Sequence, residues 1–70
     1  MQRQWIESSV LASVGYDGGT LTLEVEFKNG HVYRYFNVPF STIEGLMLAS
    51  SAGKFFSRQI RDRFKCRQMS

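Results

Sequence analysis

Four basic residues near the C-terminal end have types and a spacing that suit the binding of an anion. Lys54, Arg58, Arg61 and Lys65 follow one another at intervals of four, three and four residues. In a helix with 100° per residue these positions form one narrow stripe. The ordinary explanation of a charged stripe is a solvated face, but four like charges repel one another unless a counter-charge is bound. The pattern therefore favours an anion-binding surface.

The stripe begins at a segment that also has parts suited to a phosphate. Ser51, Gly53 and Lys54 offer a hydroxyl, a small residue and an ammonium group at the expected start of this helix, where backbone N–H groups have no partner within the helix. The spacing is not that of a Walker motif, because the upstream glycine is missing. Helix capping by a serine is the simpler interpretation, and the phosphate interpretation depends on the adjoining basic stripe.

A second group of candidate residues is aromatic and lies in the middle of the chain. Tyr33-Arg34-Tyr35 is followed by Phe36. Aromatic rings beside an arginine can stack on nucleic-acid bases or contact a protein partner, whereas inward-facing tyrosines would belong to the core. The direction in which Tyr33 and Tyr35 point therefore decides their role.

Catalysis and metal binding have little support in the sequence. His31 is the only histidine and is expected at a hairpin tip, and Cys66 has no base near it in the sequence. Histidines, cysteines and carboxylates do not occur at metal-ligand spacing, and no glycine-rich loop follows an expected strand. We therefore expect a non-catalytic binding module without a cofactor or metal.

A β-hairpin over residues 20–39 must position the aromatic group. Leu21, Leu23, Val25 and Phe27 alternate with polar residues, which predicts a strand with one buried face, and Asn29-Gly30 supplies the turn. With a two-residue turn, Val25 would pair with Arg34 and both tyrosines would face solvent. With a three-residue turn and a left-handed Gly30, Val25 pairs with Tyr33, Leu23 with Tyr35, and Glu24 with Arg34. The second register is favoured because an unpaired buried arginine is costly.

The remaining segments predict an α+β fold. Residues 10–17 read as a first strand with Val10, Ala12, Val14 and Tyr16 on one face, and this strand turns at Asp17-Gly18-Gly19 into the hairpin. A three-stranded antiparallel meander results. Ser41-Thr42-Ile43-Glu44 has the pattern of a capping box, which predicts a helix to about Ala49. A second, amphipathic helix is predicted from about Ala52 to Phe64 or slightly beyond, with both helices packed on one face of the sheet.

Length and charge predict one small domain with a basic end. The chain has 70 residues and a net charge of +3, so residues 1–70 form a single domain, with 1–8 as a flexible arm and 65–70 as a basic tail. Residues 1–50 carry three basic and five acidic side chains, whereas residues 51–70 carry six basic side chains and Asp62 alone. A core of this size is small, so a homo-oligomer is plausible. The single cysteine and the lack of a long apolar run lead us to expect a cytoplasmic protein without a membrane segment.

Several short motifs in the same order resemble the KTSC domain family. They are Gly15-Tyr16-Asp17, Leu21-x-Leu23-x-Val25-x-Phe27, Gly30, Tyr33-x-Tyr35, Val38-Pro39, Ala49-x-Ser51-x-Gly53, Phe56 and Ile60-Arg61. The resemblance covers roughly Ser8 to Phe64. The family includes the C-terminal region of some lysyl-tRNA synthetases and small stand-alone bacterial and phage proteins. The association with synthetases implies RNA binding by analogy.

Two functions follow as expectations. The first is RNA binding, in which Lys54, Arg58, Arg61 and Lys65 contact phosphates while Arg34 and Phe36, or the tyrosines in the other register, contact bases. The second is a small oligomeric bacterial or phage protein that binds a nucleotide or a protein partner, using the Ser51-Gly53-Lys54 corner or the outer sheet face.

Overall fold

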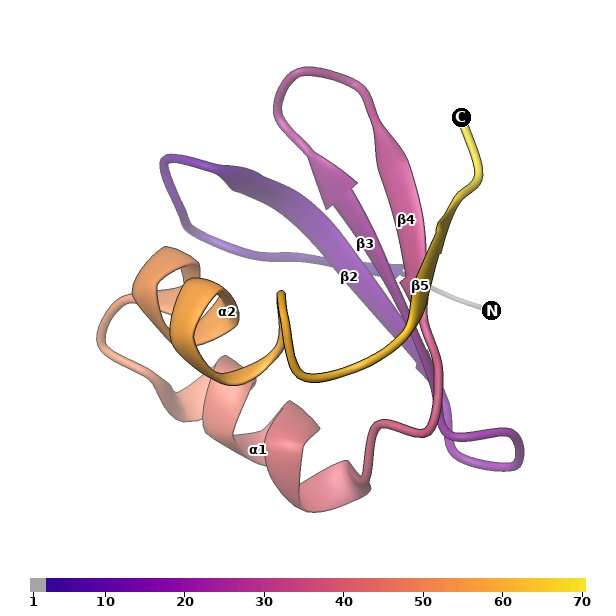
Figure 1. Cartoon of the computed structure of the whole chain (residues 1–70). Coiled ribbons are helices and arrows are strands. Elements are labelled where there is room, and N and C mark those ends of the chain that lie inside the picture. The colour runs from indigo at the N-terminus through magenta and orange to yellow at the C-terminus, as the bar shows by residue number, and fades with distance from the viewer. Residues whose placement is uncertain (1–2) are drawn as a thin grey trace.

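A computed structural model describes residues 3–70 and shows five strands and two helices (Figure 1). The elements in chain order are β1 (Arg3–Trp5), β2 (Leu11–Asp17), β3 (Thr22–Phe27), β4 (Val32–Tyr35), α1 (Phe40–Leu48), α2 (Ala52–Gln59) and β5 (Cys66–Gln68). All strand pairs are antiparallel, and the spatial order β1-β2-β3-β4-β5 follows the chain. The α+β class is confirmed.

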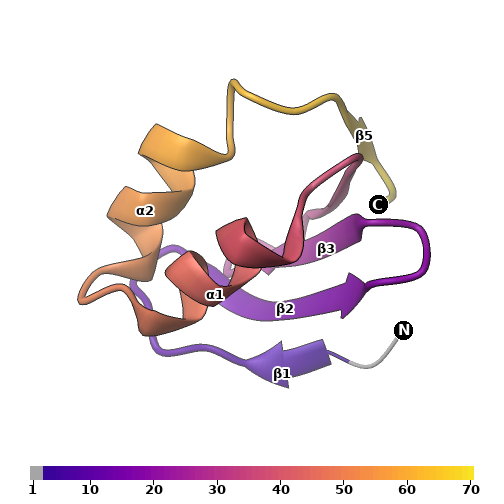
Figure 2. The same cartoon turned by 90° about the horizontal axis from the view of Figure 1, so that it is seen from below.

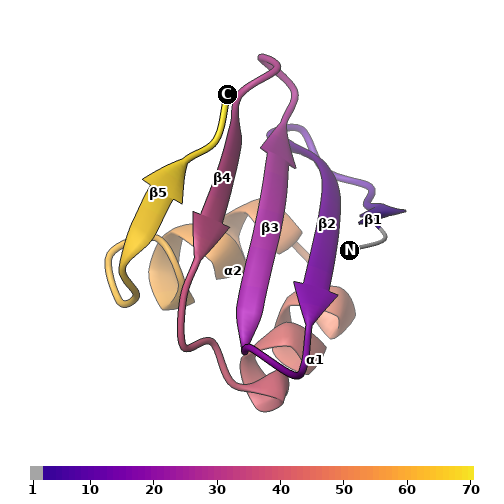
Figure 3. The ribbon, with the colours of Figure 1, turned by 90° about the vertical axis from the view of Figure 1, so that its right-hand side faces the viewer.

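Both helices lie on one face of the sheet, and the other face is open (Figures 2 and 3). The predicted count of three strands is wrong, because β1 and β5 extend the meander at its two edges. Both are three residues long and consist of exposed residues only, so neither carries the alternating apolar pattern by which a strand is recognised. The predicted arm and tail are therefore partly strand, except for residues 1 and 2, which lie outside the described residues.

The central hairpin has the register of the three-residue turn. Leu23 pairs with Tyr35, Val25 with Tyr33, and Glu24 with Arg34. Gly30 has a φ of 94°, and the backbone N–H of Phe27 donates to the carbonyl of His31 at 2.9 Å. This prediction is confirmed, and it turns both tyrosines toward the helices.

The structure corrects the predicted buried faces of the first two strands at one residue each, because Val10 and Leu21 are exposed. The register between β2 and β3 shifts between Leu11 and Ser13, so Leu11 is fully buried while Val10 is exposed. Leu21 precedes β3 with a φ of 54° and is 39% exposed. It does not continue the buried row of Leu23 and Val25, because its left-handed backbone turns its side chain out of the alternation.

Each helix differs from its prediction at one end. The first helix begins at Phe40 after Pro39, without a side-chain cap, so the capping box over residues 41–44 does not form. Ser51 does cap α2, its Oγ accepting from the backbone N–H of Lys54 at 3.3 Å. This helix ends at Gln59 and not near Phe64, because the chain must turn to pair β5 with β4.

The core lies between the sheet and the helices. It consists of residues from all of the longer elements: Ile6, Leu11, Val14, Leu23, Val25, Tyr35, Val38, Ile43, Leu46, Ala52, Phe56 and Ile60. Ile60 is fully buried although it lies just beyond α2. The residues predicted for the apolar side of the second helix therefore do pack in or against the core, although the helix is shorter than predicted.

Candidate functional site

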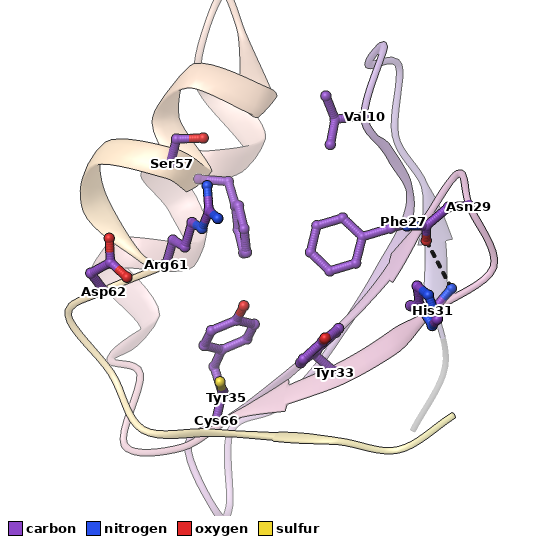
Figure 4. A pocket seen from close by; sticks show the side chains of 11 residues that line it. Val10, Phe27, Asn29, His31, Tyr33, Tyr35, Ser57, Arg61, Asp62 and Cys66 are labelled. Atoms are coloured by element: carbon purple, nitrogen blue, oxygen red, sulfur yellow. Dashed lines mark hydrogen bonds between the residues drawn. The ribbon is translucent and has the colours of Figure 1, made fainter.

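A pocket of about 470 Å³ lies between α2 and the strands β3, β4 and β5 on the covered side of the sheet (Figure 4). Tyr33 and Tyr35 of β4 form its floor, together with Phe27 at the end of β3. Phe56 and Arg61 contribute from α2 and the turn that follows it. A volume in this range suits a small ligand.

Four aromatic rings form the apolar wall of this pocket. Tyr35 meets Phe56 edge to face with ring centroids 5.4 Å apart, and Phe27 meets both Tyr33 at 5.7 Å and Phe56 at 5.4 Å in the same way. Edge-to-face pairs fix ring orientations. Tyr33 remains half-buried, so part of its ring is open to the pocket.

Tyr35 keeps its hydroxyl proton at all ordinary pH values. Its side chain is 4% exposed, and burial, followed by the charges of Cys66 and Tyr33 on ionisation, raises the pKa of Tyr35 to about 12. The Arg61 guanidinium opposes this shift of the pKa without cancelling it. The hydroxyl is thus available as a donor inside the pocket.

The rim of the pocket is polar and carries both signs of charge. Arg61 and Asp62 stand on the turn after α2, and His31 stands at the tip of the hairpin opposite (Figure 4). The turn at Arg61 is held by its backbone N–H, which donates to the carbonyl of Phe56 at 2.9 Å. His31 is anchored by its own N–H, which donates to Asn29 Oδ1 at 3.0 Å.

A second depression of about 320 Å³ lies against the first half of α2. It is lined by Ser51, Gly53, Lys54 and Arg58, four of the residues singled out from the sequence. The hydroxyl of Ser51 is already used as the N-cap. Gly53 lies where α2 approaches Ser8 and Val10, and a Cβ there would meet Ser8 Oγ at 3.6 Å. Lys54 and Arg58 are exposed, so their cationic groups are the parts available to a ligand.

The two depressions adjoin along α2, since Val10 and Ser57 line both of them. Lys54 and Arg58 therefore lie beside the first depression, the tyrosine pocket lined by Tyr33, Tyr35 and Arg61. The sequence placed the cations and the tyrosines in separate groups, and the fold brings them together.

Three other predicted site residues lie elsewhere. Arg34 faces the open side of the sheet, where its Nε donates to Glu24 Oε1 at 2.9 Å. Phe36 follows β4 and is half-buried, and its N–H donates to the carbonyl of Lys65 at 2.9 Å. Lys65 lies between α2 and β5, six residues beyond the end of the helix, so the predicted four-residue helical stripe is wrong. Only Lys54 and Arg58 of that stripe are on α2.

Sequence reasoning missed several residues that line the pocket, notably Ser57, Asp62 and Cys66. Cys66 reaches the site because β5 pairs it with Tyr35. Nothing in a three-residue exposed strand signals that pairing. Asp62 could have been noticed as the only acidic residue within the basic end of the chain.

Residues 3–70 contain neither a candidate metal-binding cluster nor a helix that could span a membrane. No group of three or more histidine, cysteine or acidic side chains lies close enough together to hold a metal ion within this part of the chain. In the same residues neither helix is long and apolar enough to cross a membrane.

The chain is similar both to a segment of much longer proteins and to a small protein of nearly its own length. It is 44% identical over 64 residues to a lysine–tRNA ligase of Nostoc punctiforme, which covers 91% of this chain but 11% of the ligase. It is 43% identical over 58 residues to an uncharacterized protein of Stutzerimonas stutzeri, covering 83% of this chain and 82% of that protein. The chain thus spans about a tenth of the ligases that it matches.

A solved crystal structure has the same fold as this chain. The crystal structure of a KTSC domain protein from Yersinia pestis superposes with a TM-score of 0.93 at 38% identity, over 99% of this chain and 97% of that one. The family model for the KTSC domain matches residues 7–64. The resemblance noted in the sequence is confirmed, and the chain belongs to the KTSC domain family.

Proposed function

We propose that this KTSC domain is a non-catalytic module that binds single-stranded RNA along α2. The observation that carries the proposal is that the depression at Lys54 and Arg58 adjoins the tyrosine pocket at Arg61, with Val10 and Ser57 lining both. Phosphates repeat along a strand beside its bases. The phosphates of such a strand can contact the cations of the second depression while a base contacts the aromatic rings of the tyrosine pocket.

The charge distribution supports an anionic ligand. Six of the nine basic residues lie in residues 51–70, together with one acidic residue. On the open sheet face, by contrast, Arg3 and Arg34 are both neutralised by Glu24, at 3.4 and 2.9 Å. Among the cations without an ion pair in residues 3–70, Lys54, Arg58 and Arg61 are on the side of α2, whereas Arg67 is on the open face.

The relatives support RNA over other polyanions. Proteins named lysine–tRNA ligase contain a segment 39–44% identical to this chain as about a tenth of their length. A ligase of that name acts on tRNA. A separate domain within it is well placed to hold RNA, and we carry that role to this chain as part of the proposal.

The shape of the pocket favours unpaired RNA. The rings of Tyr33 and Phe27 lie inside a depression and not on an open platform. A base held inside a duplex could not enter it, whereas an unstacked base could.

Chemical-shift mapping with an eight-nucleotide RNA of mixed sequence tests this placement. The backbone amides of Ser57, Arg58 and Arg61 are expected to shift, while those of Glu24 and Arg67, on the open face, are not. Perturbations confined to the open face would overturn the proposed site.

Charge variants give a matched comparison. Lys54→Gln combined with Arg58→Gln removes two exposed cations of the second depression, and Arg67→Gln removes an exposed cation of β5, which is paired with Arg34. The double variant should weaken RNA binding and lower the slope of log Kd against log salt by about 1.4. The Arg67 variant should leave this slope nearly unchanged. Equal losses in both variants would show a diffuse attraction with no defined site along α2.

A further inference from the structure

The rim of the tyrosine pocket carries two adjacent side chains of opposite hydrogen-bonding character. Arg61 has only donors, and Asp62, when ionised, has only acceptors. Both line the pocket, and the guanidinium of Arg61 points into it (Figure 4). Within residues 3–70 neither side chain takes part in an ion pair or a side-chain hydrogen bond. Both are therefore open to a ligand.

Guanine is the base whose edges match this pair most fully. It presents two neighbouring acceptors, O6 and N7, which accept both N–H groups of an arginine fork. It also presents two neighbouring donors, N1–H and the exocyclic amino group, which match the two oxygens of a carboxylate. Cytosine offers one donor group to the carboxylate, its N4 amino group. Adenine and uracil present neither of these two pairs, because in both bases donors and acceptors alternate along the edge.

The rest of the pocket suits a planar base. The half-buried ring of Tyr33 and the edge-to-face cluster of Phe27 and Phe56 form apolar walls. The hydroxyl of Tyr35 stays protonated because its pKa is about 12, so it adds a donor and no negative charge. The volume of about 470 Å³ lies within the range of pockets that take small ligands.

We propose that the pocket formed by Tyr33, Tyr35, Arg61 and Asp62 takes one guanine base of the bound RNA. Arg61 donates to O6 and N7, and Asp62 accepts from N1–H and the exocyclic amino group. This assignment rests on the proposed RNA-binding function and adds a base preference to it. Lys54 and Arg58 supply affinity without sequence preference, and the pocket supplies the specificity.

The test uses seven-nucleotide RNAs in which a single central base varies within a run of uridines. Fluorescence anisotropy with the full chain compares central guanine, hypoxanthine, adenine, cytosine and uracil at one salt concentration. Guanine should bind roughly tenfold more tightly than adenine or uracil. Hypoxanthine, which lacks only the exocyclic amino group, should fall between them.

Asp62→Asn is the decisive variant. Asp62 is exposed and has no ion pair within the described residues, so its replacement leaves the fold intact. It should remove the difference in affinity between RNAs with central guanine and central hypoxanthine. Arg61→Lys keeps the charge, loses the fork, and should lower the preference for guanine over adenine.

The outcomes separate this inference from the proposed function. Equal affinity for all five central bases would overturn the guanine pocket while leaving RNA binding in place. A preference for cytosine, or a preference for guanine over hypoxanthine that survives in Asp62→Asn, would also overturn it. No binding of any RNA would overturn both proposals.

Discussion

Gly45 in α1 lies directly against the ring of Phe55 in α2: a Cβ at position 45 would stand 2.6 Å from Phe55 Cζ. This contact sets the distance between the two helices. It explains why a glycine occupies the middle of a helix, where it costs up to about 1 kcal/mol relative to alanine.

Gly45→Ala should therefore destabilise the protein. Overpacking of a close contact costs about 1–3 kcal/mol, which exceeds the gain in helix propensity, so we expect a net loss of about 1 kcal/mol in the free energy of unfolding. Urea denaturation measures it. Replacing the ring with a smaller side chain, in a Gly45→Ala, Phe55→Leu double variant, should restore part of the lost stability. A gain in stability from Gly45→Ala alone would disprove the contact.

Gly53→Ala in α2 is the matched control for Gly45→Ala, and we expect it to have the opposite effect on stability. A Cβ at this position would meet Ser8 Oγ at 3.6 Å and Val10 at 3.9 Å, which are ordinary contacts. The substitution should raise the free energy of unfolding by about 0.4–1 kcal/mol, because alanine restricts the unfolded chain and favours helix. A loss of stability in the same urea assay would show that α2 lies closer to Ser8 than described.

Glu24 holds two arginines on the open face of the sheet. Its carboxylate, 13% exposed, lies 2.9 Å from Arg34 Nε and 3.4 Å from Arg3 Nε. Glu24→Gln should lower the free energy of unfolding by about 1 kcal/mol, since Arg34 would lose its counter-charge and Arg3 would keep only Glu26, 3.7 Å away. Glu44→Gln, at an exposed position of α1, is the control. High salt should shrink the difference between the two variants, and a difference that salt leaves unchanged would rule out an electrostatic cause.

The buried hydroxyl of Tyr35 makes stability depend on alkaline pH. Its pKa is about 12 in the folded protein, against about 10 in an unfolded chain. The stabilisation is complete below pH 10 and declines as pH rises from 10 toward 12, because the unfolded chain ionises first. The decline should reach at most about 2–3 kcal/mol.

Urea denaturation between pH 9 and 11.5 measures this decline. Tyr35→Phe should make the curve flatter over this interval. A Tyr35→Phe protein with the same slope as the natural chain would contradict the assignment of the raised pKa.

The sequence was sufficient to predict the hairpin. The cost of burying Arg34 without a partner selects the register that pairs it with Glu24, and the structure has that register. The edge strands could not be predicted, because β1 and β5 bury no side chain and so carry no alternating apolar pattern. The end of α2 was misplaced for a related reason. Ile60 and Phe64 keep the apolar spacing of a helix and do contact the core, but the backbone leaves the helix at Ile60.

The site was predicted in parts but not as a whole. Tyr33, Tyr35 and Arg61 were candidates for separate reasons, and only the tertiary fold shows that they line one pocket. Lys65 was grouped with Arg61 because a longer helix was expected. The contribution of Cys66 depends on β5, which is invisible in the hydrophobic pattern.

The salt dependence of RNA affinity tests the central claim most directly. Anisotropy titrations of an eight-nucleotide single-stranded RNA between 50 and 300 mM potassium chloride give the slope of log Kd against log salt concentration. If Lys54 and Arg58 each neutralise one phosphate, Kd should rise with a slope of about 1.4. An affinity that does not change with salt, or no binding at the lowest salt concentration, would contradict the proposal that this domain binds RNA along α2.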